Sequence, residues 1–168
     1  MGLDFSLYKK RKDQSVDDFF NSENLDELEL AYGRKSWELV YKLADSKDID
    51  NCYGLLKHKN WQDLMRQFAD IGDKLDDIWE AYGHYEYYLE HLDDDDRNVI
   101  DRSNIIFTQL DRILIAQYEY WYQKTFGTTP TLGYYFSVGY MKSFYEAKDL
   151  VRDVLTDPDY DVLMSISY

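Results

Sequence analysis

The feature that most constrains this chain is a long amphipathic pattern over residues 60–92. Asn60 stands where a helix N-cap is expected. Apolar residues then recur every three or four positions, as they do on one face of an α-helix, at Trp61, Leu64, Met65, Phe68, Ile71, Leu75, Ile78, Trp79, Tyr82, Tyr85 and Leu89. The spacing predicts one continuous helix from about residue 60 to 92. Its apolar face must be buried against other elements.

Weaker patterns predict the remaining elements. Apolar spacing and end signals indicate three further helices, at about residues 25–45, 99–126 and 141–155. Strict alternation at residues 3–8 and an aromatic stretch at 132–138 indicate two short strands. The last ten residues are left unassigned. We therefore expect a single α+β domain over residues 1–168, mainly α, with about four helices and a small two-stranded β element.

Caps and breaks mark the ends of these predicted helices. Asn24, followed three residues later by Glu27, resembles a capping box before the first helix. Gly127 is placed to end the third helix, and Pro158 follows the fourth.

Composition limits the class of protein. Of the 168 residues, 45% are hydrophobic and 17% aromatic, which is too many for a disordered chain. The formal net charge of −14 repels nucleic acid and anionic lipid, so we expect neither as a direct partner. No apolar run reaches the roughly 18 to 20 residues that cross a bilayer. Cys52 is the single cysteine and cannot form an internal disulfide, so a cytoplasmic protein is expected.

Four carboxylates follow the predicted 60–92 helix at intervals of three, four and three residues. They are Asp70, Asp73, Asp77 and Glu80. On a continuous helix these side chains would line one ridge opposite the apolar face, about 5 to 6 Å apart. This spacing is close to that of phosphates along a nucleic-acid strand, so a nucleic-acid mimic is one hypothesis. A solvated helix face, softened by Arg66 and Lys74, is the alternative.

Other chemistries have little support in the sequence. Asp93 to Asp96 lack the glycine and spacing of a calcium loop, and His84 and His91 match no zinc motif. Cys52 and His58 could act as a pair only if the fold brought them together. We expect no metal, no cofactor and no catalytic residue, and favour a protein that is not an enzyme.

The N-terminus also matches a degenerate myristoylation pattern through Gly2 and Ser6, with basic residues at 9–12 as a second membrane signal. A strand at residues 3–8 that packs in the core would leave such lipidation without a purpose.

Two segments are informative when taken together, the opening MGLDFSLYKK and the segment ELAYGRKSWELV at residues 29–40. They resemble a family of small uncharacterised proteins of bacteriophages and prophages. Ala31, Tyr32, Arg34 and Lys35 match the AY-x-RK signature of the family helix, and residues 133–140 resemble its aromatic strand. Gly33, Trp37 and Val40 depart from the tryptophan, asparagine and histidine of the family, so no role of that histidine is carried over.

The resemblance implies a phage origin and a host bacterial cytoplasm, but no established chemistry. Our leading hypothesis is an acidic accessory protein that binds a basic protein surface, such as a nuclease or a CRISPR effector, and inhibits host defence by nucleic-acid mimicry. The alternative is a small enzyme or ligand-binding protein that uses Tyr32, Arg34 and Lys35. A third hypothesis is a structural homodimer whose long helices pair across a two-fold axis through surplus aromatic residues.

Overall fold

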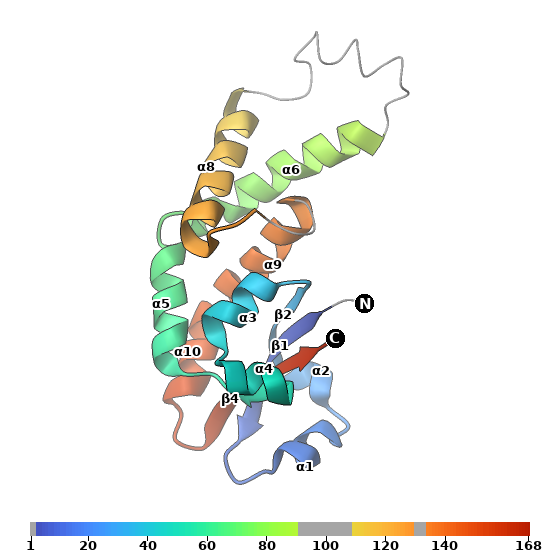
Figure 1. The fold of residues 1–168 in the computed structure, drawn as a ribbon, viewed down its shortest axis with the longest axis vertical. Helices are drawn as coiled ribbons and strands as arrows, with labels where there is room; N and C mark the ends of the chain where they lie inside the picture. The colour runs from blue at the N-terminus through green and yellow to red at the C-terminus, as the bar shows by residue number, and fades with distance from the viewer. Residues whose placement is uncertain (1–2, 91–108, 130–133) are drawn as a thin grey trace. The chain divides into compact units, whose positions relative to one another are not determined.

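The computed structural model describes residues 3–90, 109–129 and 134–168 (Figure 1). The chain divides into two compact units. Unit 1 consists of Met1–Phe68 and Ser143–Tyr168, and unit 2 consists of Ala69–Lys142. The two ends of the chain therefore build one unit, and unit 2 is an insertion in its sequence.

A four-stranded antiparallel sheet is the centre of unit 1 (Figure 1). Its strands are β1 (Asp4–Arg11), β2 (Glu29–Arg34), β3 (Tyr53–Leu55) and β4 (Tyr160–Ser167), in the order β2-β1-β4-β3. The two central strands come from opposite ends of the chain and pair in full, with Phe5 opposite Ile166 and Leu7 opposite Met164. These four side chains share one face of the sheet and are almost completely buried.

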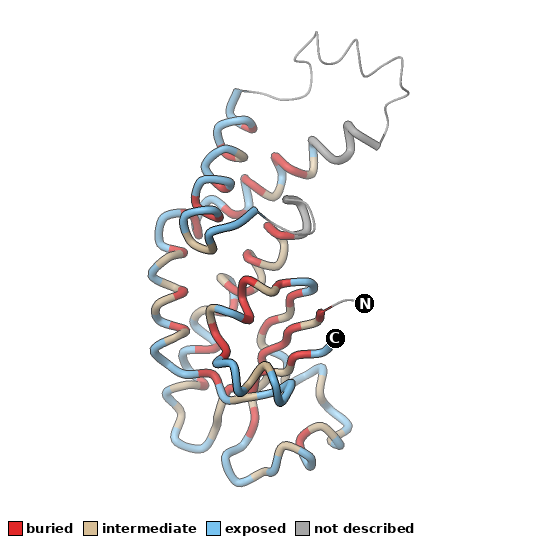
Figure 2. Tube along the Cα trace, in the orientation of Figure 1, coloured by how far each residue is buried: buried red, intermediate tan, exposed pale blue. Residues whose placement is uncertain are grey.

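The helices of unit 1 are α1 (Val16–Phe20), α2 (Leu25–Leu28), α3 (Trp37–Leu43), α4 (Ser46–Asn51), α5 (His58–Phe68) and α10 (Lys148–Thr156). Helices α1, α3, α5 and α10 bury apolar side chains in the core (Figure 2), whereas α2 and α4 contain no buried residue. Phe144 stacks on Phe5 with ring centroids 5.8 Å apart. Phe19 of α1 meets the ring of Tyr8 edge-on at 5.6 Å.

Unit 2 contains a 3-10 turn and three helical segments. They are η1 (Gly72–Lys74), α6 (Leu75–Glu90), α8 (Gln109–Phe126) and the part of α9 (Tyr134–Glu146) up to Lys142. Helices α6 and α8 pack through aromatic rings, with Tyr82 and Tyr118 at a centroid distance of 6.0 Å. The hydroxyl of Tyr118 shares a buried hydrogen bond of 2.6 Å with Ser137 of α9.

The predicted fold was wrong in its β content. Among the described residues, nine α-helices accompany a four-stranded antiparallel sheet, in place of about four helices and a two-stranded element, although the molecule is mainly helical. The predicted 25–45 helix is interrupted because Glu29–Arg34 pairs with β1 as a strand. The last residues, which the sequence left unassigned, form the central strand β4. Pairing with strands distant in the sequence determines the structure of both segments, and local sequence signals do not show that pairing.

Three other predicted elements need correction. The predicted strand at 132–138 is wrong from Tyr134 onward, where α9 begins, and residues 132–133 lie outside the described part. The predicted 141–155 helix is two helices that meet at Ala147. Helix α8 begins at Gln109 within the predicted 99–126 helix, whose residues 99–108 are not described.

Several local predictions are confirmed. The N-terminal strand is present as β1, and its residues Phe5 and Leu7 are fully buried. Helix α8 ends at Phe126, and Gly127 follows with a positive φ of 74°, which glycine adopts without strain.

Two predicted caps need correction. Asn24 stands at the N-cap of α2 but makes no side-chain cap hydrogen bond, so the predicted capping box is not formed. Asn60 is not an N-cap, because α5 begins at His58; its side chain donates to the carbonyl of Leu43 at 3.1 Å.

Candidate functional site

The four carboxylates of the predicted ridge lie on three different elements. Asp70 is in the turn after α5, Asp73 is in η1, and Asp77 and Glu80 are in α6. All four are exposed. The prediction of a continuous helix over residues 60–92 is wrong, because α5 ends at Phe68 and the helical path resumes only at Gly72. Gly72 lowers helix propensity by about 1 kcal/mol relative to alanine, which favours a break here.

Three of the four carboxylates still share one side of a regular segment. η1 leads directly into α6, whose buried side carries Leu75, Ile78 and Tyr82. Asp73, Asp77 and Glu80 are spaced by four and three residues and lie on the exposed side. We call these three residues the α6 acidic face. Like charges one turn apart repel by a few tenths of a kcal/mol, and a cationic partner would reduce this repulsion.

The ion pairs around α6 set the limits of this face. Asp76 is paired with Lys142 of α9 at 3.0 Å, so its charge is partly neutralised. Asp77 and Glu80 form no hydrogen bond or ion pair with any described residue. Further along α6, Nδ1 of His84 lies 3.6 Å from the largely buried carboxylate of Asp111. The part of the face centred on Asp77 and Glu80 is therefore available to an external cation.

Asp70 belongs to a pocket in unit 2 that the sequence did not predict. The pocket has a volume of about 260 Å³ and lies between the turn before α6 and one side of α8. Its lining combines two lysines, one carboxylate, one amide and apolar or aromatic side chains, namely Asp70, Ile71, Lys74, Gln117, Tyr120, Trp121 and Lys124. We call it the α8 pocket. Nζ of Lys74 donates to Oε1 of Gln117 at 3.4 Å across it.

The alternative site of Tyr32, Arg34 and Lys35 lies on and just after β2, where the sequence had predicted a helix. The hydroxyl of Tyr32 donates to Oδ1 of Asp4 at 3.1 Å, and Nε of Arg34 lies 3.9 Å from the same oxygen. Lys35 is exposed, has a positive φ of 50°, and its backbone amide donates to the carbonyl of Leu3 at 2.5 Å. Tyr32 and Arg34 of β2 thus both contact Asp4 of the neighbouring strand β1.

A polar cluster at the start of β2 was missed by the sequence analysis. Oγ of Ser6 donates to Oε1 of Glu29 at 2.8 Å, and Ser6 is buried. Burial raises the pKa of the neighbouring Tyr8, a hydrogen bond with Ser6 lowers it, and the negative charge of Glu29 raises it again. Serine and glutamate have no obvious sequence signal at this spacing, because the contact joins residues 23 positions apart.

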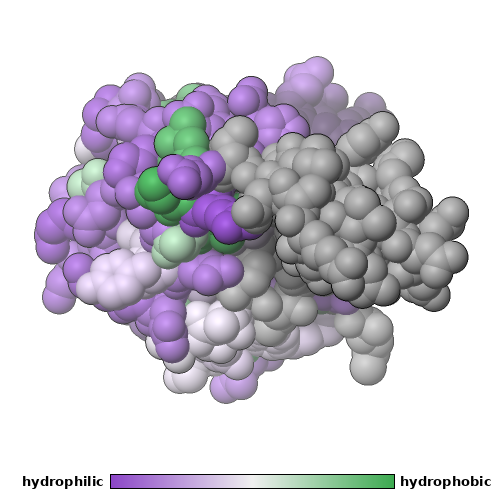
Figure 3. All heavy atoms as spheres, turned by 90° about the horizontal axis from the view of Figure 1, so that it is seen from above, coloured by the Kyte–Doolittle hydropathy of each residue, from purple (hydrophilic) through white to green (hydrophobic). Residues whose placement is uncertain are grey.

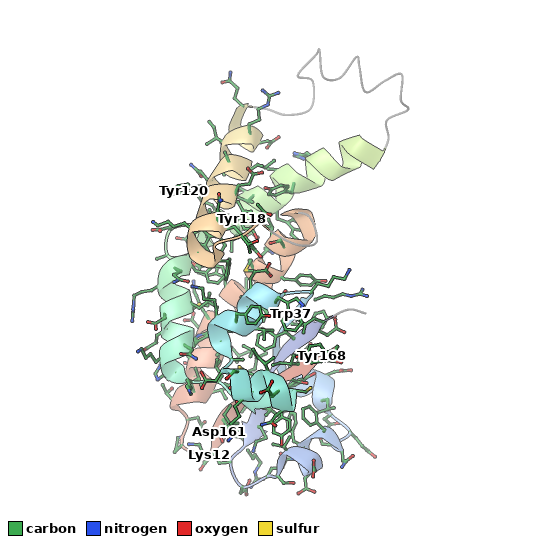
Figure 4. All side chains as sticks on the ribbon, in the orientation of Figure 1. Lys12, Trp37, Tyr118, Tyr120, Asp161 and Tyr168 are labelled. Carbon is green, nitrogen blue, oxygen red and sulfur yellow. The ribbon has the colours of Figure 1, made fainter. Side chains whose placement is uncertain are left out.

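A second missed feature is a group of exposed aromatic rings in unit 1. Trp37 stacks on Tyr41 at a centroid distance of 5.5 Å, and Tyr168 lies at the same distance from Trp37 (Figure 4). Tyr41 and Tyr168 are more than half exposed. Most of the residues that are coloured by hydropathy in Figure 3 are hydrophilic, and a small hydrophobic patch lies among them.

In the part of the chain that the structure describes, no side chains are arranged as a metal-binding site or as a Cys–His nucleophilic site. No group of three or more His, Cys, Asp or Glu side chains there is placed to hold a metal ion. His91 and Asp93 to Asp96 lie outside the described residues. Cys52 is exposed at the C-cap of α4 with a positive φ of 63°, and no hydrogen bond joins it to His58.

Comparisons with known proteins add no identification. No protein-family model, curated protein or solved structure matches this chain. The resemblance to phage proteins therefore stays a prediction from the residues themselves. Among the described residues, no helix has the length and apolar character needed to span a bilayer.

Proposed function

We propose that this protein acts by binding a basic surface on another protein through the α6 acidic face. The observation that carries the proposal is the exposed, regularly spaced set of Asp73, Asp77 and Glu80 on one side of η1 and α6. The surroundings support it, because residues 69–142 contain 14 acidic and six basic residues in a chain of net charge −14. A field of this sign steers basic partners toward the surface and discourages acidic ones.

The partner class follows from the carboxylate spacing and from the phage resemblance. Asp73 to Glu80 extend over seven residues, or about 10 Å of helix, which is comparable to two phosphates along a strand. We therefore propose a nucleic-acid-handling defence protein, such as a nuclease or a CRISPR effector, whose nucleic-acid groove receives this face. Asp70 is not part of the mimicking surface, because it lines the α8 pocket.

The test is binding to purified basic nucleases and CRISPR effectors, with competition by duplex DNA. We expect affinity to fall as salt rises from about 0.05 to 0.5 M, because screening shortens the range of the attraction. The triple variant Asp73→Lys, Asp77→Lys and Glu80→Lys should lose binding and should no longer compete with DNA.

A matched control separates this face from net charge alone. Glu23→Lys, Glu27→Lys and Asp50→Lys reverse three exposed acids of unit 1 and change the net charge equally. This variant should bind nearly as tightly as the unmodified protein. Binding that ignores salt, or that both triple variants lose equally, would contradict the proposal.

A further inference from the structure

The α8 pocket carries a second inference that does not depend on the proposed function. All of its lining residues belong to unit 2, and one of them, Asp70, precedes Asp73 of the α6 acidic face by three residues. A volume of about 260 Å³ is just below the roughly 300 to 1,000 Å³ typical of small-molecule sites. The pocket can therefore receive a single ring or a group of similar size.

The two lysines of the pocket are unusual in so acidic a molecule. With 33 acidic and 19 basic residues in the chain, a lysine has many carboxylates available. Even so, Lys124 forms no ion pair or hydrogen bond with a described residue, and the partner of Lys74 is the amide of Gln117 at 3.4 Å. Neither lysine is ion-paired with Asp70. Two ammonium groups are thus left for an anion, and at physiological salt the remote negative charges are screened beyond about 8 Å.

Aromatic and apolar side chains form the rest of the wall. Trp121 and Ile71 are almost fully buried and present an apolar surface at the pocket. Tyr120 is 70% exposed and projects from α8 on the side away from Tyr118 (Figure 4). An exposed tyrosine beside a buried tryptophan can cover the face of a planar ring, which both aromatic residues favour.

Asp70 adds a selective group. Its carboxylate would repel an anion unless the ligand offers it a hydrogen-bond donor, because an ionised carboxylate only accepts hydrogen bonds. A ligand that suits all seven residues is therefore anionic at one end, planar, and equipped with an N–H or O–H group. From this combination we propose that the α8 pocket binds a small planar anion whose ring carries a hydrogen-bond donor, the anionic group being a carboxylate or a phosphate.

Four probes separate the parts of this proposal by calorimetric titration of the full chain at physiological salt, where the remote negative charges are screened. 4-Aminobenzoate carries the carboxylate, the ring and the donor, and benzoate lacks the donor. Cytidine monophosphate supplies a phosphate with an amino-substituted ring, and inorganic phosphate lacks the ring. We expect at least one of the two complete probes to bind, about three- to tenfold more tightly than its incomplete counterpart. Which complete probe binds identifies the anionic group.

Variants assign the binding to this pocket. The double variant Lys74→Gln and Lys124→Gln should weaken binding by about tenfold or more, because it removes both charged donors. Lys47→Gln and Lys59→Gln change two exposed lysines of unit 1, remove the same charge, and should leave binding unchanged. Asp70→Ala should abolish the preference for the probe with the donor.

Three results would overturn the proposal. The first is that no probe binds at millimolar concentration. The second is that inorganic phosphate or benzoate binds as tightly as its complete counterpart. The third is that the pocket double variant and the control double variant bind alike, which would show that the anion is held by general charge elsewhere.

Discussion

At the scale of single residues, the burial of the Tyr8 hydroxyl makes the stability of the fold depend on pH. Tyr8 lies on β1 beside Phe19, Ser6 and Glu29. Its pKa is raised above 10.0, first because burial disfavours the phenolate, with a further increase from the charge of Glu29. The hydrogen bond with Ser6 opposes this shift. The neutral form of Tyr8 is therefore favoured in the folded protein.

This shift predicts a loss of stability at high pH. The unfolded chain ionises Tyr8 near pH 10, before the folded protein does, so its stabilising contribution is complete below about pH 10 and is lost as the pH rises through the folded pKa. Urea unfolding at pH 8 and at pH 11 should show a smaller loss of unfolding free energy for Tyr8→Phe than for the unmodified protein. Tyr53→Phe, at an exposed position, is the control. Equal losses for all three proteins would show that Tyr8 does not contribute.

Gly139 of α9 offers a sharper test of packing in unit 2. A Cβ atom added at Gly139 would clash with Cζ3 of Trp79, so the indole would have to move. Gly139→Ala should lower the unfolding free energy by about 1 to 3 kcal/mol, measured by urea unfolding, because overpacking forces side chains out of their preferred positions. An exposed helical glycine replaced by alanine would give a gain of up to about 1 kcal/mol instead.

The double variant Gly139→Ala with Trp79→Leu removes the indole that causes the clash. The alanine should then cost less than it does in the presence of Trp79, and this difference measures the coupling of the two positions. A stabilised Gly139→Ala variant would contradict the contact between α9 and α6.

At the scale of elements, the segments with strong apolar periodicity were the ones that the sequence could predict. β1 and much of α5, α6 and α8 were predictable because their buried residues repeat at strand or helix intervals. The break after Phe68 was missed because Ile71 and Leu75 continue the same spacing across it, so the apolar pattern does not change. Only Gly72 signals the interruption.

The sheet was harder to predict because its strands pair across the chain. β2 follows helix-start signals at Asn24, and its partner β1 lies more than 20 residues earlier. In β4, Val162, Leu163 and Met164 are all buried, since this central strand is covered on both faces. A continuous apolar run is typical of such a strand, but it lacks the alternation that identified β1.

The candidate sites also differ in whether local sequence pattern could predict them. Exposure of Asp73, Asp77 and Glu80 could be predicted because their spacing places them opposite the apolar residues of η1 and α6. The α8 pocket could not, because Asp70 and Lys124 are separated by more than 50 residues and meet only through the packing of α8. The alternative site stays a prediction, and the sequence did not show that strand pairing brings Tyr32 and Arg34 to Asp4.

At the scale of the whole molecule, the interrupted sequence of unit 1 has a consequence for folding. Its sheet needs both ends of the chain, since β4 pairs with β1 and β3. The two points where unit 2 enters and leaves are close in space, because the rings of Phe68 and Tyr145 lie 5.7 Å apart between centroids. Insertions of this kind are tolerated when the host has its own core and the ends of the insertion are adjacent.

We therefore predict that unit 1 folds without unit 2. A variant in which a short Gly/Ser linker replaces residues 69–142 should keep the β-sheet signal in circular dichroism and unfold in a single urea transition. Adding Phe144→Ala to it removes the ring stacked on Phe5 and should destabilise it by about 3 to 5 kcal/mol. A linker variant without cooperative unfolding, or one that is indifferent to Phe144→Ala, would show that the core of unit 1 depends on the inserted residues.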